Sequence, residues 1–346
     1  MSTLSAPARR RRAAAPSFAH LVRLTDDTGL FEHARRATVR RAHGYCTDDV
    51  ARGLVAVSRE PGTTPALARL AEVYLTFLAH AQDDDGAFRN RLGFDRRWTD
   101  QPGTGDWWGR ALWGLGTAAV RSPASWIRDE ALDMFHRGAR RRSSAPHAMT
   151  FAGLGAAEVL RADPGDAVAR ELLADAAAGV GRPGADPAWC WPYPYLSYAS
   201  AALAEVVIAA GQLGGDTALR DDGLRMLTWL RDVQRVGDQL SVVPASGWRQ
   251  GTPRRRYDQQ PIEVAAFADA CATAAEATGD LRWHQGVRQA VDWFHGANDG
   301  SVVMMNHDTG GGYDGLTPTG PNANQGAEST LALLTTLQHG RNLPEA

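Results

Sequence analysis

Apolar residues recur every three or four positions through most of the chain, within Ala- and Leu-rich runs. This spacing places them on one face of a helix. Gly, Pro and Asp separate the runs, and Pro261 stands where one helix should begin. The pattern predicts helices over residues 48–60, 65–82, 106–120, 124–140, 147–161, 166–179, 197–212, 216–235, 261–278, 280–296 and 325–339, and a weaker one near 27–37.

The predicted helices alternate in character. Those that start near residues 48, 106, 148, 197, 261 and 326 are rich in small residues and poor in charge, whereas their partners carry charged residues on one face. A helix that is apolar nearly all round is buried, and an amphipathic helix covers it. The sequence therefore predicts an all-α fold, an (α/α)6 toroid in which six hairpins form an inner and an outer ring of helices.

No Pro- or Ser-rich linker divides the predicted toroid. We expect residues 17–346 to form a single (α/α)6-toroid domain, and residues 1–16, which contain four successive arginines, to form a disordered N-terminal tail.

All 37 basic side chains are arginine, and the chain contains no lysine. This excludes an enzyme that forms a Schiff base through a lysine amine, and a phosphate-binding loop of the GxxxxGK[ST] type. The formal net charge of −2 gives no electrostatic reason to expect a nucleic-acid partner. No apolar run is long enough to span a membrane. The scattered Cys46, Cys190 and Cys271 argue against a disulfide framework, so we expect a cytoplasmic protein.

Carboxylates, amides and aromatic residues gather at the starts of the predicted inner helices, which a ring fold brings to one rim of a central cavity. Glu263 shares a helical face with Ala266 and Phe267, and Glu328 shares one with Leu331. A charge that faces a core is costly unless it is paired or lines a wet cavity. Two aspartates join these glutamates, which gives the predicted catalytic residues Asp49, Asp106, Glu263 and Glu328.

A structural alternative exists for several rim positions. Helix capping alone would explain an Asp or Asn at a helix start, and this applies to Asp48, Asp106, Asp258 and Asn324. Asp106 and Arg110 are four residues apart, so they would form a local ion pair on one helix.

The rim has the composition of a carbohydrate site. Sugar rings stack their apolar C–H faces on aromatic side chains, and their hydroxyls bind carboxylates, amides and arginine. Two carboxylates across the cavity would serve as general acid and general base on a glycosidic bond. The predicted substrate-binding residues are Asp48, Trp107, Trp108, Arg110, Trp191, Tyr198, Asp258, Gln260, Tyr313, Asp314 and Asn324.

Several motifs resemble those of a known family. They are TDDTG at residues 25–29 with His33 and Ala34, GYCTDD at 44–49, GRALWGLG at 109–116 and NQGAESTL at 324–331. They are similar to a bacterial family of (α/α)6-toroid proteins, related to the six-hairpin glycosidases, whose members are often encoded with glycosyltransferases or fused to them. The resemblance covers residues 20 to 340 and implies carbohydrate processing or binding, an oligosaccharide or glycan substrate, and a glycosyltransferase partner. It also implies that the protein uses no metal or organic cofactor.

The chain departs from this family pattern before the fourth inner helix. The family has a glutamate where Tyr193 stands here, and an asparagine where Ser200 stands. If that glutamate is catalytic, this chain has altered or lost activity. If it only positions the substrate, the remaining carboxylates suffice.

Three hypotheses follow. The first is a glycoside hydrolase with Glu263 or Glu328 as acid and Asp49 or Asp106 as base, and a separation of about 6.5–9.5 Å would make it inverting. The second is a catalytically silent sugar-binding or glycosyltransferase-partner domain. The third is another toroid enzyme. A sugar epimerase would use histidines near the cavity, and a terpene cyclase would use an acid cluster; the candidates are His43, His147 and His307 for the former and Asp83, Asp84 and Asp85 for the latter.

Overall fold

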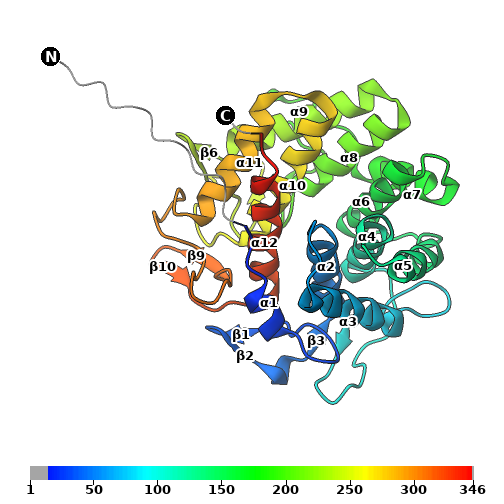
Figure 1. Ribbon diagram of the computed structural model, residues 1–346. Helices are drawn as coiled ribbons and strands as arrows, with labels where there is room; N and C mark the ends of the chain where they lie inside the picture. The colour runs from blue at the N-terminus through cyan, green and yellow to red at the C-terminus, as the bar shows by residue number, and fades with distance from the viewer. Residues whose placement is uncertain (1–14, 345–346) are drawn as a thin grey trace.

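A computed structural model describes residues 15–344 of the chain. The predicted tail, residues 1–16, lies outside the described residues except for its last two. Twelve α-helices form the described part, six in an inner ring and six in an outer ring (Figure 1). The inner helices are α2 (Thr47–Ser58), α4 (Asp106–Arg121), α6 (Pro146–Ala162), α8 (Ala201–Gly214), α10 (Pro261–Thr278) and α12 (Ala327–Arg341). The outer helices are α1 (Ala19–Leu24), α3 (Pro65–Ala81), α5 (Ser125–Gly138), α7 (Ala167–Val180), α9 (Thr217–Val233) and α11 (Leu281–Phe294).

The inner helices form a closed ring. Each packs against the next along the chain, and α12 packs against α2 to complete the circle. Each of the first five inner helices also packs against the outer helix that follows it, and α12 packs against α11 and against α1 from the other end of the chain. The structure is an (α/α)6 toroid, which confirms the predicted fold.

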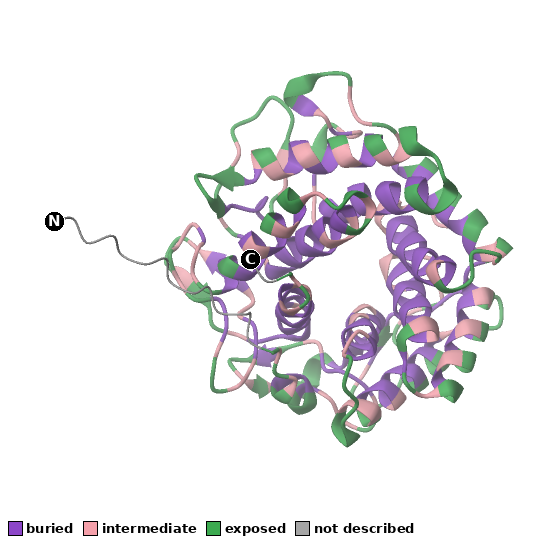
Figure 2. Cartoon of the chain, turned by 45° about the horizontal axis from the view of Figure 1, so that its top comes forward, coloured by how far each residue is buried: buried purple, intermediate pink, exposed green. Residues whose placement is uncertain are grey.

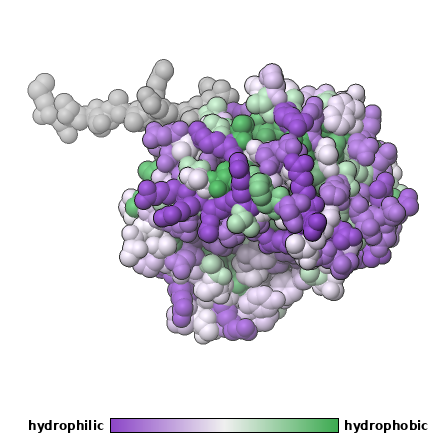
Figure 3. Space-filling model, turned by 90° about the horizontal axis from the view of Figure 1, so that it is seen from below, coloured by the Kyte–Doolittle hydropathy of each residue, from purple (hydrophilic) through white to green (hydrophobic). Residues whose placement is uncertain are grey.

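Burial follows the predicted alternation of helices. Inner helices are buried along most of their length, whereas outer helices bury one side and expose the other (Figure 2). The outer surface seen from below is mostly hydrophilic, with small hydrophobic patches (Figure 3). Among the described residues, no helix combines the length and the apolarity that a membrane span requires.

Glycine allows the helices α4 and α6 to approach each other closely. A Cβ added at Gly109 would lie 2.1 Å from the carbonyl oxygen of Ala148, and one added at Gly155 would lie 2.2 Å from that of Leu112. Both atoms are backbone oxygens, so no side-chain rotation would relieve the clash. Small residues in the inner helices therefore set the width of the ring.

The weak helix predicted near residues 27–37 is wrong. The side chain of Asp26 accepts hydrogen bonds from the backbone N–H groups of Thr28 and Gly29, which makes a turn there. A small hairpin follows, with β1 (Ala34–Arg35) paired to β2 (Thr38–Val39). The outer helix of the sixth hairpin is instead the short α1.

Helix α8 starts four residues later than predicted, while every other predicted inner helix starts within two residues of its expected position. Residues before α8 form the strand β5 (Tyr195–Leu196), which pairs with β8 (Trp248–Arg249). Ala199 then adopts a φ of 46°, which interrupts the helical backbone. The remaining strands also lie in loops and are β3 (Tyr45–Cys46), β4 (Arg91–Leu92), β6 (Arg235–Val236), β7 (Gln239–Leu240), β9 (Gly315–Thr317) and β10 (Gly320–Asn322).

Candidate active site at the rim of the inner ring

Charged side chains from four inner helices meet at the end of the ring where those helices begin. We call them the rim cluster, which consists of Asp48, Asp49, Arg52, Asp106, Arg110, Glu263 and Glu328. Arg52 joins two of the helices, because it donates hydrogen bonds to Asp49 on α2 and, at 2.8 Å, to Glu328 on α12. Sequence reasoning did not place Arg52 in the site, although it lies one helical turn from Asp49.

Arg110 on α4 is central to the rim cluster. Its side chain is buried, its Nε lies 3.6 Å from a carboxylate oxygen of Asp48, and its guanidinium stacks 3.8 Å from the ring centre of Phe151. Burial, together with repulsion from Arg52, lowers the pKa of Arg110 to about 10. The side chain of Arg110 thus pairs with Asp48 on the neighbouring helix α2, and the predicted local ion pair with Asp106 does not form.

Burial has different consequences for the rim carboxyl groups. It raises the pKa of Asp49 to about 6, although Arg52 opposes the shift. It also raises the pKa of Glu263 to about 8, against the hydrogen bond that the backbone N–H of Ala199 donates to Glu263 at 2.5 Å. Glu263 is thus protonated at neutral pH.

Glu328 and Asp106 respond in opposite directions. Burial acts to raise the pKa of Glu328, but Arg52 and Arg110 outweigh it and hold the pKa below its usual value. Burial raises the pKa of Asp106, whose carboxyl group has no hydrogen-bond partner among residues 15–344. The rim therefore holds an ionised glutamate and protonation-prone carboxyl groups around one arginine.

The capping alternative is wrong for the aspartates and the asparagine at the helix starts. Helices α2, α4, α10 and α12 begin without any side-chain cap hydrogen bond. The backbone N–H of Gly326, at the start of α12, is instead satisfied by Asp314, at 2.7 Å. Asp314 thus supports the start of α12 from a neighbouring loop, whereas no hydrogen bond to a helix start explains Asp48 or Asp106.

An apolar cavity runs from the rim cluster into the ring. Arg52, Arg110 and Glu328 line it beside the rim cluster, and Trp113, Phe151 and other apolar side chains line most of its wall. Glu205 and Asp269 also line it, so the cavity leads from the rim cluster to a second set of carboxyl groups.

Several predicted binding residues lie elsewhere. Trp108 is fully buried and its indole N–H donates to the carbonyl of Gly138, so its ring is part of the core. Trp191 is buried against Trp229. Trp107 is half-buried and donates to the carbonyl of Phe88 at 2.6 Å.

The other predicted binding residues lie around the rim. Tyr198 is half-buried and stacks on His147, with 4.4 Å between ring centres. Asn324 accepts a hydrogen bond from the backbone of Arg36. Asp258 is exposed, while Gln260 and Tyr313 are half-buried.

Of the two positions that depart from the family pattern, Tyr193 lies away from the rim cluster, whereas Ser200 lies beside it and hydrogen-bonds Glu263 through its backbone. The hydroxyl of Tyr193 donates to the carbonyl of Gly179, at the end of the outer helix α7. The side chain of Ser200 donates to the carbonyl of Ser197, within the same loop.

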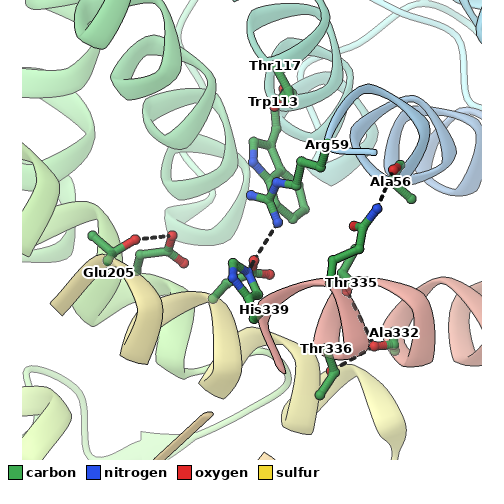
Figure 4. A network of polar contacts seen from close by, with 12 residues as sticks. Ala56, Arg59, Trp113, Thr117, Glu205, Ala332, Thr335, Thr336 and His339 are labelled. Atoms are coloured by element: carbon green, nitrogen blue, oxygen red, sulfur yellow. Dashed lines mark hydrogen bonds and ion pairs between the residues drawn. The ribbon is translucent and has the colours of Figure 1, made fainter. Parts of the chain in front are cut away.

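A second charged cluster lies deeper in the ring and escaped sequence reasoning (Figure 4). We call it the deep cluster, which consists of Arg59, Glu158, Glu205, Asp269 and His339. Asp269 lies six residues beyond Glu263, which is about 9 Å further along α10. It accepts hydrogen bonds at 2.6 Å from Arg59, and its Oδ1 lies 2.6 Å from His339 Nε2. An isolated acid within an Ala-rich run, such as Glu205, is the sequence signal that would have found it.

One group of side chains has atoms of the kind that bind metals. Potential ligand atoms of Glu32, Cys46 and Asp49 all lie within 4.8 Å of one another. Arg91 binds Glu32 and Arg52 binds Asp49, so both carboxylates already have cationic partners. Burial also raises the pKa of the Cys46 thiol well above its usual value, which disfavours the thiolate that binds metals.

The rim geometry belongs to a fold shared with carbohydrate-active enzymes. A sugar epimerase from a ruminal bacterium superposes with a TM-score of 0.72 at 13% identity, over 94% of this chain and 96% of that one. Cellobiose 2-epimerase from Bacillus thermoamylovorans gives 0.68 at 12% identity, over 92% and 95%. A metagenome-derived glycoside hydrolase family 9 endoglucanase gives 0.60 at 13% identity, over 91% and 71%.

At these identities the comparison shows the fold alone, that of the six-hairpin glycosidase-like toroid enzymes. No protein-family model matches the sequence, and comparison with curated proteins gives no match.

Proposed function

We propose that the chain is a carbohydrate-active enzyme whose rim cluster hydrolyses glycosidic bonds. One observation carries the proposal: the rim holds carboxyl groups whose environments push their pKa values apart. Glu328 is held ionised by Arg52 and Arg110, whereas burial raises the pKa values of Asp106 and Glu263. Such a division supplies an acid and a base at one pH.

Glu328 is the general base in this proposal. It lines the apolar cavity, and 42% of its side chain is exposed, so it is within reach of water. Glu328 takes a proton from the water molecule that attacks the anomeric carbon. This reverses the sequence hypothesis, in which a glutamate is the acid and an aspartate the base.

Asp106 is the general acid. Its carboxyl group is half-buried and has no hydrogen-bond partner among the described residues, so it is free to give its proton to the glycosidic oxygen. Glu263 is buried and held by the backbone of Ala199, so we assign it a positioning role in the wall of the site. Asp49 orients Arg52, which in turn orients Glu328.

The test is turnover of an oligosaccharide panel by Glu328→Gln and Asp106→Asn. Each variant should lose about 10²- to 10⁴-fold in kcat, the usual contribution of a general acid or base. Glu130→Gln on the outer helix α5 is the matched control, because Glu130 is exposed. Full turnover by both rim variants would reject this site.

A sugar epimerase is the second candidate, and His147 favours it. Its Nε2 lies 2.7 Å from the carbonyl oxygen of Tyr198, which only accepts, so Nε2 carries the hydrogen and Nδ1 has the free lone pair. Burial, aided by Arg110, lowers the pKa of His147 to about 4, which keeps it neutral and able to accept a proton. NMR of the products separates the two activities: an epimer whose formation is lost in His147→Asn would favour this candidate.

A silent sugar-binding domain would bind oligosaccharides in calorimetry without converting them. The association with a glycosyltransferase and the cytoplasmic location stay predictions. Co-purification of the tagged chain from its native cells, followed by fractionation, tests both.

A further inference from the structure

A larger cleft of about 840 Å³ opens beside the rim cluster. Two segments line it, residues 195–198 before α8 and residues 245–255 in the loop before α10. Pairing of β5 with β8 holds the two segments together, with Tyr195 opposite Arg249 and Leu196 opposite Trp248. The cleft therefore has a built wall on both sides.

The segment before α8 separates this cleft from the candidate active site. Tyr198 lines the cleft and stacks on His147, whose pKa is affected by Arg110. The next residue, Ala199, lines the apolar cavity that runs from the rim cluster into the ring, and its backbone N–H donates a hydrogen bond to Glu263. A carbohydrate that reaches the rim carboxylates would thus extend into the cleft.

The charge of the cleft is one-sided. Its lining contains Arg249, Arg254 and Arg255 and, among the described residues, no carboxylate. No ion pair within residues 15–344 involves any of these three side chains, whereas the adjacent Arg256 pairs with Asp299. Arg254 is held by the backbone and hydroxyl oxygens of Ser241 and is attracted to Asp299, so its charge is fixed in place and partly balanced, whereas Arg249 and Arg255 have no such partner among the described residues.

Aromatic rings lie beside these cations. Tyr195 is 45% exposed. Trp248 donates its indole N–H to the carbonyl of Thr252 at 2.7 Å and packs edge-on against Trp189, so its orientation is fixed. An aromatic ring next to unpaired guanidinium groups can stack a sugar ring and bind an anionic substituent on it.

We propose that the substrate is an anionic carbohydrate, and that this cleft binds its charged group. The group is a carboxylate, as in a uronate, or a phosphate or sulfate ester, since the planar guanidinium fork binds all of these. The inference rests on the proposed function for the rim, and it adds the chemical class of the substrate.

The experiment uses the full chain and an array of di- to hexasaccharides, in which each neutral glycan has matched uronate, 6-phosphate and 6-sulfate counterparts. Acidic members should bind at least about tenfold more tightly than their neutral counterparts, and added salt should weaken that preference. The double variant Arg249→Gln/Arg255→Gln should reduce the preference to less than about threefold. The three acidic arms distinguish the carboxylate from the phosphate and the sulfate.

The matched control is Arg137→Gln/Arg140→Gln, which removes the same charge from exposed positions at the end of the outer helix α5. This control should keep the preference, and thermal melting should show all variants folded. Equal binding of neutral and acidic glycans, or a preference that survives the cleft variant, would overturn the inference. If neutral glycans are still hydrolysed in a Glu328-dependent way, the proposed hydrolase activity stands and only the anionic substrate is rejected. If no member of the array binds, both the proposed activity and the anionic substrate are rejected.

Discussion

The rim cluster and the deep cluster both lie within the inner ring, yet they balance charge differently. In the deep cluster, Asp269 has two partners within 2.6 Å, and Glu158 lies between Arg59, Arg121 and Arg161. In the rim cluster, two arginines serve five carboxyl groups, and Asp106 has no ion-pair or hydrogen-bond partner among the described residues.

This difference separates a structural role from a chemical one. Burial alone would raise the pKa of Asp269, but Arg59 and His339 outweigh it and lower the pKa to about 2. Asp269 is therefore ionised at any working pH and has no proton to give. Arg52 serves two carboxylates at the rim, and burial is left to raise the pKa values of Asp49 and Glu263. Carboxyl groups that lack a cation of their own thus keep a proton that chemistry can use. Glu205 is the one of this kind in the deep cluster, because burial and repulsion from Asp269 raise its pKa.

The largest expected effect is the loss of stability in Arg59→Met. This change removes the strongest ion-pair partner of Asp269 and one of the three arginines near Glu158. Breaking a buried ion pair by removing one partner costs about 3–5 kcal/mol of unfolding free energy. Urea unfolding measures the free energy. Arg137→Met, on an exposed part of α5, is the control. A loss below about 1 kcal/mol would mean that the deep cluster does not hold the ring together.

Substitution of two rim aspartates should change the unfolding free energy less than Arg59→Met does, and by different amounts. Asp49→Asn removes a buried partner of Arg52 and should cost about 1–3 kcal/mol of unfolding free energy. Asp106→Asn removes no partner and should stay within about 0.5 kcal/mol of the parent. Equal losses from the two changes would contradict the contrast, and the same urea titration measures both.

Two carboxyl groups, Asp269 in the deep cluster and Glu263 at the rim, should give stability opposite pH dependence. The folded pKa of Asp269 is lowered from 3.8 to about 2, so its stabilisation is present above pH 3.8 and is lost as the pH falls towards 2. The folded pKa of Glu263 is raised from 4.5 to about 8, so the folded state holds an extra proton and stability falls as the pH rises between these values. Melting temperatures across both windows show the two slopes.

Matched variants assign each slope to its residue. Asp269→Asn should flatten the acid slope. Glu263→Gln should reduce the slope above pH 5, to which Asp49 and Glu205 also contribute because burial raises their pKa values. Glu130→Gln, an exposed residue, should change neither. Slopes that persist in the matching variant would belong to other groups.

The smallest effect is expected for Glu205→Gln. Burial and repulsion from Asp269 raise the pKa of Glu205 to about 8, so the side chain is already neutral at pH 7. Glutamine has the same shape and can still accept the 2.9 Å hydrogen bond that Thr273 donates to Glu205. Stability at pH 7 should change by no more than about 0.5 kcal/mol. A larger loss would show that Glu205 is ionised in the fold.

Local signals in the sequence predict most of the ring. Helix α10 has the predicted bounds because Pro261 opens it and Gly279, in a left-handed conformation, ends it. Helix α1 has only six residues and depends on packing against α12, so its own sequence does not predict it. The real start of α8 depends on pairing with a strand about fifty residues away, which periodicity does not reveal.

The candidate site could be predicted only in part for a similar reason. Helix starts alone indicated the rim carboxylates, because a ring fold brings such starts together. Trp107 and Trp108 are neighbours in sequence, yet one is half-buried and the other is wholly within the core. The deep cluster joins Arg59 to Asp269 and His339 across more than two hundred residues, and no local pattern encodes such a contact.

The packing of α1 against α12 also determines when the ring of helices can close during synthesis. During synthesis, each of the first five inner helices emerges shortly before its outer partner. The last inner helix, α12, has to return to α1, which is made before the rest of the ring (Figure 1). The imidazole of His20 on α1 lies 2.9 Å from the carbonyl oxygen of Gln325, just before α12. Contacts of such sequence separation form slowly, since a long loop must close first. We therefore expect the toroid to stay an open arc until α12 has been made.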